Sequence, residues 1–254
     1  MLVWTLDARS SVPAWRIVPA PSGARLAFST RRGGVSPPPW DTLNLGRSTP
    51  DDPENVTENR RRLVVSLRFD PSALATAGQV HGARCALVTG PGHEPSCDAL
   101  CTLTPNVVVA VSSADCLPIL LTVEGAVAAA HAGWRGTVAG VVEAAVTAIC
   151  RAAQVSPDRV HAHFGPCIRD CCYVVGPEVA RQFPRESVRE VNGEIRLSLP
   201  AAARRRLLDA GLEDGSISDT GACTACEPHW YFSHRRDRGM TGRHWGLAAW
   251  DGSP

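Results

Sequence analysis

Lysine is absent from this sequence, and every basic residue is an arginine. This absence excludes a Schiff-base lysine and the phosphate-binding lysine of a P-loop. The 26 basic residues are nearly balanced by 25 acidic residues, which leaves a formal net charge of +1. Charge therefore gives no indication of a nucleic-acid partner or an anionic membrane. Genomic base composition is the simplest explanation for the missing lysine.

Long apolar segments are missing as well. The longest runs, over 106–111 and 117–123, are far below the roughly 20 residues that span a bilayer. The first nine residues are interrupted by Asp7 and do not resemble a signal peptide. Ten cysteines are present, and in a protein without these export features we expect reduced thiols. The expected location is the cytoplasm, with no membrane partner.

The sequence has the composition of a globular α/β protein. Hydrophobic residues make up 44% of the 254 residues, which is enough for a sizeable core. Continuous apolar runs predict strands buried on both faces, at 107–112, 117–123 and 127–131. Apolar spacing and end signals predict helices, at 52–67, 136–153, 177–183 and 200–210. The first third, rich in Pro and Gly over 31–46, is predicted to be rich in loops. Without repeats or a long linker, residues 1–254 are predicted to form one α/β domain with helices covering buried sheets.

Three apolar stretches end abruptly in a side chain that can bind a metal, namely His81, Cys116 and His131. They are too far apart for zinc-finger spacing, so the fold must bring separate strand ends together, as α/β sheets commonly do. Thiolate and imidazole suit Zn²⁺. Three protein ligands leave a fourth place for water or substrate, as in catalytic zinc sites. On spacing alone, ordinary core or surface roles for these residues remain the alternative.

Polar neighbours of these residues suggest further roles. Asp115 and Gln79 are placed to orient ligands or to transfer protons. Arg135 lies in a strand-to-helix turn with two glycines, where backbone N–H groups and a guanidinium suit an anion. Asn44, in a loop rich in Gly and Pro, suits either a hydrogen bond to a bound ligand or a turn cap.

Several motifs follow one another along most of the chain: Arg32-Gly-Gly-Val-Ser, Leu43-Asn-Leu-Gly, Gln79-Val-His-Gly, Ala114-Asp-Cys-Leu-Pro, His131-Ala-Gly-Trp-Arg-Gly, Gly165-Pro-Cys-Ile, Cys172-Tyr-Val-Val-Gly and Phe232-Ser-His-Arg-Arg-Asp. Through them, residues 25–248 resemble the YfiH-like laccase-domain (polyphenol oxidase) family. Its members are described as purine nucleoside phosphorylases and adenosine deaminases. The resemblance implies that His81, Cys116 and His131 bind zinc. It also implies a fold in which mixed β-sheets pair between helix layers.

The resemblance implies phosphorolysis of adenosine, inosine and 5′-methylthioadenosine, together with hydrolytic deamination of adenosine. The expected partners are a small nucleoside and inorganic phosphate, in a monomer or small homo-oligomer. Cys116 and Asp115 are the predicted catalytic residues, with Asp115 as the acid/base group. Predicted substrate contacts comprise arginines suited to phosphate and two amide side chains: Arg47, Arg135, Arg235, Asn44 and Gln79.

Three other functions compete with this prediction. A copper-dependent polyphenol oxidase would load copper into the same three ligands, although the sequence has only two methionines, Met1 and Met240, as axial candidates. A hydrolase editing peptidoglycan precursors would use Cys116 as nucleophile and His131 as base. A non-enzymatic zinc module would be built on Cys223-x₂-Cys226, completed by His229 and by Cys97 or Cys101.

Overall fold

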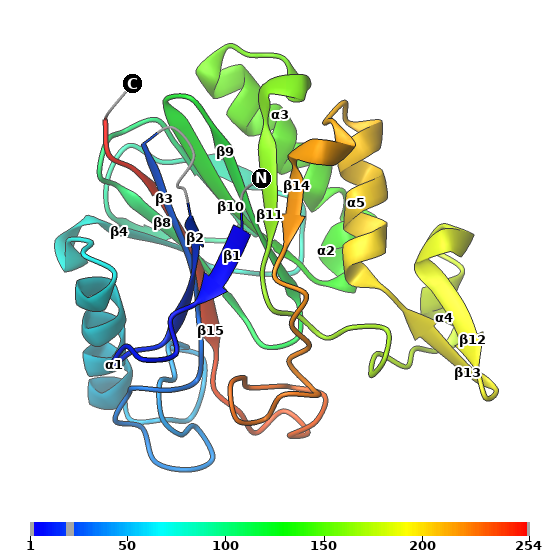
Figure 1. The fold of residues 1–254 in the computed structure, drawn as a ribbon, viewed down its shortest axis with the longest axis horizontal. Helices are drawn as coiled ribbons and strands as arrows, with labels where there is room; N and C mark the ends of the chain where they lie inside the picture. The colour runs from blue at the N-terminus through cyan, green and yellow to red at the C-terminus, as the bar shows by residue number, and fades with distance from the viewer. Residues whose placement is uncertain (1–2, 19–22, 253–254) are drawn as a thin grey trace.

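The computed structural model describes residues 3–18 and 23–252, and in them two β-sheets pack face to face between layers of helix (Figure 1). The larger sheet has the strand order β1 (Val3–Leu6), β2 (Ala14–Val18), β3 (Ala24–Ser29), β15 (His244–Trp250), β8 (Val108–Ser113), β4 (Leu74–Ala77) and β6 (Gly92–Glu94). The second has the order β14 (Ile217–Asp219), β11 (His161–Phe164), β9 (Leu117–Val123), β10 (Ala126–Ala132), β7 (Ala99–Thr102) and β5 (Cys85–Leu87). Both sheets contain parallel and antiparallel pairs, which confirms the mixed α/β fold.

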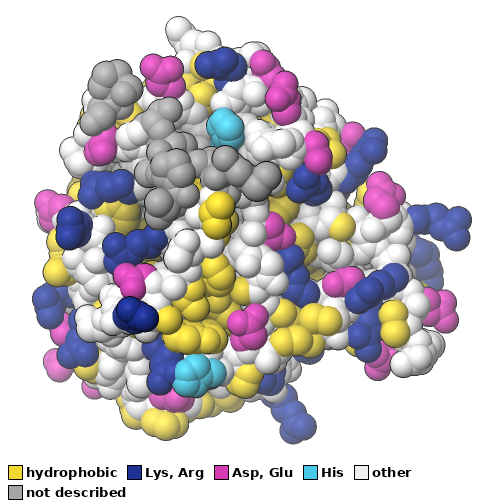
Figure 2. Space-filling view, viewed as in Figure 1, with side chains coloured by type: hydrophobic (Ala, Val, Ile, Leu, Met, Phe, Trp, Pro, Cys, Tyr) yellow, Lys and Arg dark blue, Asp and Glu magenta, His cyan; other side chains and the backbone are white. Residues whose placement is uncertain are grey.

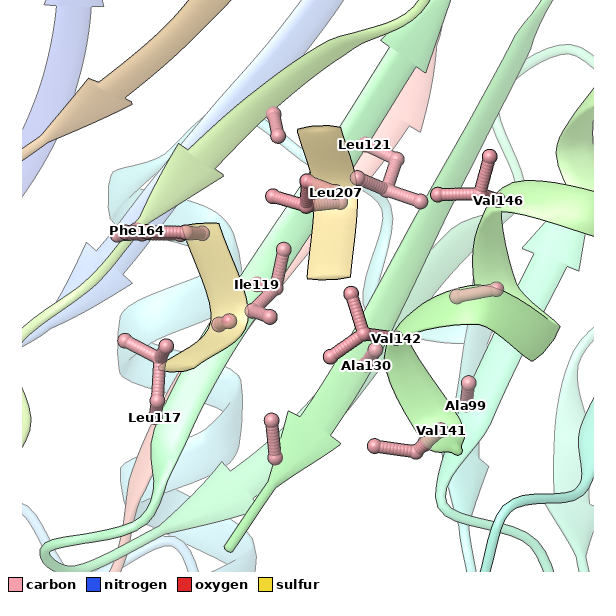
Figure 3. Packing of buried hydrophobic residues seen from close by; sticks show 14 of the residues in the cluster. Ala99, Leu117, Ile119, Leu121, Ala130, Val141, Val142, Val146, Phe164 and Leu207 are labelled. Carbon is pink, nitrogen blue, oxygen red and sulfur yellow. The ribbon is translucent and has the colours of Figure 1, made fainter. Parts of the chain in front are cut away.

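Alternation along the central strands assigns their side chains to three cores. In β9, Leu117, Ile119 and Leu121 face the helices α3 (Val141–Ala153) and α5 (Leu199–Asp209), as Figure 3 shows. Leu120 points the other way, into the core between the sheets. A period of two places alternate residues on opposite faces, and every residue of β9 and β10 is buried. The prediction of strands buried on both faces is thus confirmed for the two central strands.

The third core lies between the outer face of the larger sheet and helix α1 (Pro53–Ser66), where Leu63 packs with Trp245 and Leu247. The beginning of α1 follows from its sequence. The side chain of Asp52 accepts a hydrogen bond from the Glu54 backbone N–H at 2.8 Å, and a proline occupies the first turn. The predicted helix over 52–67 is confirmed.

One prediction about the elements was wrong, and three strands were missed. The helix expected over 136–153 is divided into α2 (Trp134–Ala139) and α3, because Gly140 takes a left-handed backbone at φ +98°. The first third was predicted to be rich in loops, and residues 30–52 contain no helix or strand. The sequence analysis did not single out β1, β2 and β3, which form one side of the larger sheet. Strand β3 pairs with β15, β2 pairs with β3, and β1 pairs with β2.

A small lobe projects from one side of the molecule. It consists of α4 (Pro177–Ala180) and the hairpin of β12 (Val188–Val191) and β13 (Glu194–Leu197), drawn in yellow in Figure 1. The face seen in Figure 2 carries arginines and acidic side chains intermixed. Among the described helices, none combines the length and apolar character needed to cross a bilayer.

Candidate active site

A cavity of about 820 Å³ opens where several strands of both sheets end. Its size lies within the range of roughly 300–1,000 Å³ that is usual for small-ligand sites. The lining includes all but one of the predicted site residues, namely Arg47, Gln79, His81, Asp115, Cys116, His131, Arg135 and Arg235. The fold therefore brings together residues that are distant in the sequence, and only Asn44 lies outside the lining.

His81, Cys116 and His131 meet in this cavity. Their ligand atoms all lie within 4.8 Å of one another, and the two imidazole rings are 4.9 Å apart between centroids. His81 stands in the turn after β4 with a left-handed backbone at φ +59°, Cys116 directly precedes β9, and His131 lies near the end of β10. Because β9 and β10 are antiparallel neighbours joined by a tight turn, their far ends bring Cys116 and His131 together.

Asp98 organises this cluster, although the sequence analysis assigned it no role. It is fully buried, and its Oδ1 is 2.8 Å from His131 Nδ1. Its carboxylate also accepts hydrogen bonds from the backbone N–H groups of Val80, His81 and Gly82 at 2.7–3.0 Å. One carboxylate thus fixes the turn that carries the first histidine and the ring of the second. The sequence signal that could have identified Asp98 is its position, an acidic residue directly before the buried strand β7.

Electrostatics around the cluster shift the pKa values of the two imidazoles in opposite directions. Burial, followed by the charge of His131, lowers the pKa of His81, which keeps this ring neutral. Burial alone would also lower the pKa of His131, but Cys116 and the Asp98 hydrogen bond outweigh it and raise the pKa to about 9. Burial raises the pKa of Asp98, yet hydrogen bonds from His131 and the backbone bring it below its usual value. Asp98 therefore stays ionised and holds Nδ1–H of His131, so Nε2 is the ring nitrogen that a metal ion would bind after displacing its proton.

The three donors fit a single metal ion. Zinc distances of about 2.0–2.3 Å place tetrahedral ligands about 3.3–3.8 Å apart, which the spacing of these donor atoms accommodates. Clearance comes from Gly133, where an added Cβ would stand 2.7 Å from Cys116 Sγ and 3.2 Å from His81 Nδ1. A residue with a side chain at this position would therefore occupy the space between the ligands.

Asp115 and Gln79 are braced in the wall of the cavity. Asp115 has a left-handed backbone at φ +86° and accepts hydrogen bonds from Thr224 Oγ1 and the Arg235 backbone N–H, both at 2.6 Å. The amide of Gln79 exchanges two hydrogen bonds of 2.7 Å with the backbone of Ser112 in β8. Both residues line the cavity, and both are also committed to holding its wall together.

Asn44 is the one predicted substrate contact that does not line the cavity. It is fully buried, and its side-chain nitrogen donates to Asp51 and Thr49, while its oxygen accepts from the backbone N–H groups of Gly46 and Arg243. With both ends of its amide engaged, Asn44 braces the loop, which is the turn-stabilising alternative considered from the sequence.

The arginines that line the cavity differ in whether their guanidinium groups are hydrogen-bonded to the protein. Arg47 and Arg135 form no hydrogen bond or ion pair with other described residues, although Arg135 stacks on Trp134 at 4.3 Å. Arg235 donates to the carbonyl of Val174 at 2.6 Å and lies over the Tyr173 ring. Two further lining arginines, Arg60 and Arg243, were missed from the sequence and donate to backbone carbonyls. Only Arg47 and Arg135 therefore present uncommitted guanidinium groups.

The fold and the site together define the class of protein. The chain belongs to the family described as multi-copper polyphenol oxidoreductase laccase, whose model matches residues 25–251. Among its relatives is a purine nucleoside phosphorylase of Deinococcus radiodurans, 42% identical over 227 residues that cover 87% of each chain. Purine nucleoside phosphorylase YfiH of Escherichia coli is 39% identical, covering 91% of this chain and 95% of its own. The crystal structure of YlmD from Geobacillus stearothermophilus superposes with a TM-score of 0.91 at 34% identity, covering 98% and 99%.

Proposed function

We propose that this chain is a zinc-dependent purine nucleoside phosphorylase that also deaminates adenosine, with adenosine, inosine and 5′-methylthioadenosine as substrates. One observation carries the proposal: a single cavity joins a cluster of two histidines and one cysteine to uncommitted arginines. The names of the relatives from Deinococcus radiodurans and Escherichia coli support the phosphorylase part of this proposal. The ten free thiols suit a reducing compartment, and we propose the cytoplasm as the place of action.

In phosphorolysis, an oxygen of inorganic phosphate bonds to the ribose C1′ while the bond from C1′ to the purine N9 breaks. Arg47 and Arg135 can hold the phosphate, because their guanidinium groups are free for bidentate contacts. The positive charge of Arg135 also helps to lower the pKa of His81. The purine leaves with the bonding electrons and takes up a proton. Zinc held by His81, Cys116 and His131 would supply Lewis-acid polarisation of a substrate atom.

In deamination, water adds to the purine C6 and the amino group leaves as ammonia. Protons must therefore move from the attacking water to the leaving amino group. Asp115 is the proposed acid/base residue because its carboxylate lines the cavity beside Cys116. Hydrogen bonds from Thr224 and the Arg235 backbone hold this carboxylate in one position. A fixed position is what efficient proton transfer to a bound substrate requires.

A second candidate, the cysteine hydrolase, is favoured by one specific contact. Asp98, His131 and Cys116 form a chain in which a carboxylate orients an imidazole beside a thiol, as in catalytic triads. The place of His81 argues for metal binding instead, because a triad has no use for a second imidazole within 4.8 Å of the thiol. Copper chemistry, which the family description suggests, uses the same donors and differs in the ion that purified protein contains.

The test incubates pure protein with adenosine in the presence and absence of phosphate and separates the products by chromatography. We expect adenine only with phosphate and inosine in both cases. His81→Ala should lose both products, whereas Cys150→Ala, which changes a cysteine on α3 outside the cavity, should keep them. Full activity of His81→Ala, with loss in Cys116→Ala alone, would instead support Cys116 as a nucleophile that needs no metal ion. Stoichiometric copper in protein purified without added metal would support the oxidase.

A further inference from the structure

A second cluster of sulfur atoms lies outside the lining of the cavity. The Sγ atoms of Cys171, Cys172, Cys223 and Cys226 all lie within 4.8 Å of one another. The shortest separation is 3.2 Å, between Cys172 and Cys226. Cys171 lies 3.5 Å from Cys223 and 3.5 Å from Cys226. The sequence analysis named His229 and Cys97 or Cys101 as partners of Cys223 and Cys226. None of these three residues belongs to the group.

The sheet explains why these cysteines meet. Cys171 and Cys172 lie in the segment after β11, and Cys223 and Cys226 lie in the segment after β14. The two strands are parallel neighbours, so both segments leave the sheet at the same edge. A parallel bridge between Cys167 and Cys223 continues the pairing beyond the strands. The adjacency of the thiols is therefore built into the sheet and does not depend on an exposed loop alone.

The spacing suits one tetrahedral ion. Zinc–sulfur distances of about 2.3 Å place four thiolates about 3.8 Å apart, a value between the shortest separations of 3.2–3.5 Å and the 4.8 Å within which all four sulfurs lie. An iron–sulfur cluster, with several irons and sulfides between its cysteines, needs a wider cage. Four soft thiolates and no vacant place are the donor set of a structural zinc site.

Groups around the cluster also suit a metal thiolate. Cys223 Sγ accepts a hydrogen bond from the Arg169 backbone N–H at 3.5 Å, and the Arg196 guanidinium donates to the Cys171 carbonyl at 2.6 Å. The guanidinium of Arg169 donates to the carbonyl of Ala222, next to Cys223. Each guanidinium is also ion-paired, Arg169 with Asp219 and Arg196 with Glu194, so both arginines brace the backbone around the four sulfurs.

We propose that Cys171, Cys172, Cys223 and Cys226 bind one zinc ion that fastens together two walls of the cavity. Tyr173 follows Cys172 and lines the cavity, while Thr224 follows Cys223 and donates its hydroxyl to Asp115. Neither segment belongs to a helix or a named strand, so a cross-link here supplies order that regular structure does not. This site is independent of which reaction the cavity performs.

The first test counts metal ions in full-length protein expressed in zinc-supplemented medium and passed through a desalting column. We expect two zinc ions per chain in the wild type, one in Cys116→Ala, one in Cys226→Ser and two in the control Cys150→Ser. One ion in the wild type and none in Cys116→Ala would overturn the proposal. These two proteins decide the matter even if Cys226→Ser fails to fold.

The second test measures thiol alkylation of the native wild type by peptide mass spectrometry. Cys171 and Cys226 are exposed, so unbound thiols there should react at once. We expect both to be protected until a chelator is added and then to react together with Cys172. Immediate reaction, or protection that only a reductant removes because a disulfide has formed, would overturn the proposal.

Discussion

The two sulfur-bearing clusters differ in how many donors they gather and in what they face. His81, Cys116 and His131 supply three donors at the wall of a cavity of about 820 Å³. The four cysteines after β11 and β14 supply a complete tetrahedral set outside the cavity lining. Three ligands leave room for a substrate, whereas four close the site. The two proposals thus assign sulfur a catalytic role in the first cluster and a structural role in the second.

Removing one sulfur from each cluster should give the largest contrast. Cys116→Ala should lower both phosphorolysis and deamination by at least about 100-fold, because it removes a direct ligand. Cys226→Ser should keep kcat/KM within about tenfold, which corresponds to roughly 1.4 kcal/mol in the barrier. Product formation by chromatography measures both. Equal losses of activity in the two variants would contradict the different roles proposed for the two clusters.

Filling the space between the ligands should separate metal binding from folding. Gly133→Ala places a Cβ 2.7 Å from Cys116 Sγ, so we expect one ion fewer per chain and an activity loss of about 10–100-fold. Gly215→Ala is the control, since an added Cβ there meets nothing within 4 Å. Metal analysis and circular dichroism check the result, and an unchanged metal content in Gly133→Ala would contradict the fit of the ion.

The carboxylate behind the cluster should affect metal affinity without changing a ligand. Asp98→Asn loses the charge that holds His131 Nδ1 and turns an amide toward backbone N–H groups. We expect metal binding about 10–100-fold weaker, measured by competition with a chelator. Asp209→Asn, at an exposed ion pair on α5, should show wild-type affinity. The same weakening in both variants would assign the effect to overall charge.

The smallest effect should distinguish the two reactions. Arg135→Gln removes a cation that has no ion pair among the described residues, so the KM for phosphate should rise about tenfold, or ~1.4 kcal/mol. Deamination of adenosine, which uses no phosphate, should change little. Arg205→Gln, on the surface of α5, is the control. Initial rates at varied phosphate provide the measurement, and an equal loss of deamination would place Arg135 at the nucleoside instead.

Local sequence signals predicted the central elements and failed where distant pairing decides the structure. The apolar run of β9 and the capped start of α1 carry their own information. Strands β1 to β3 do not, because their short segments become strands only through pairing with one another and with β15. The break at Gly140 was missed because apolar spacing continues almost unchanged from α2 into α3.

The candidate site shows the same division. Residues at strand ends, such as His81 and Cys116, were predicted because a buried run that stops at a polar residue is visible in sequence. Asp98 was missed because its role depends on four hydrogen bonds that only the fold creates. Cys171 and Cys172 were missed as partners of Cys223 because adjacent cysteines lack a recognised ligand spacing, and the parallel pairing of β11 with β14 supplies the proximity.

The buried clamp made by Asp98 has a consequence for how an ion is acquired. Since the turn of His81 and the ring of His131 are tied to one carboxylate by the polypeptide itself, the receptor is preorganised before any ion arrives. Exchange of one metal for another then costs little rearrangement. Under the metal-binding proposal, the softness of the donors and the cellular supply would then govern which ion binds there.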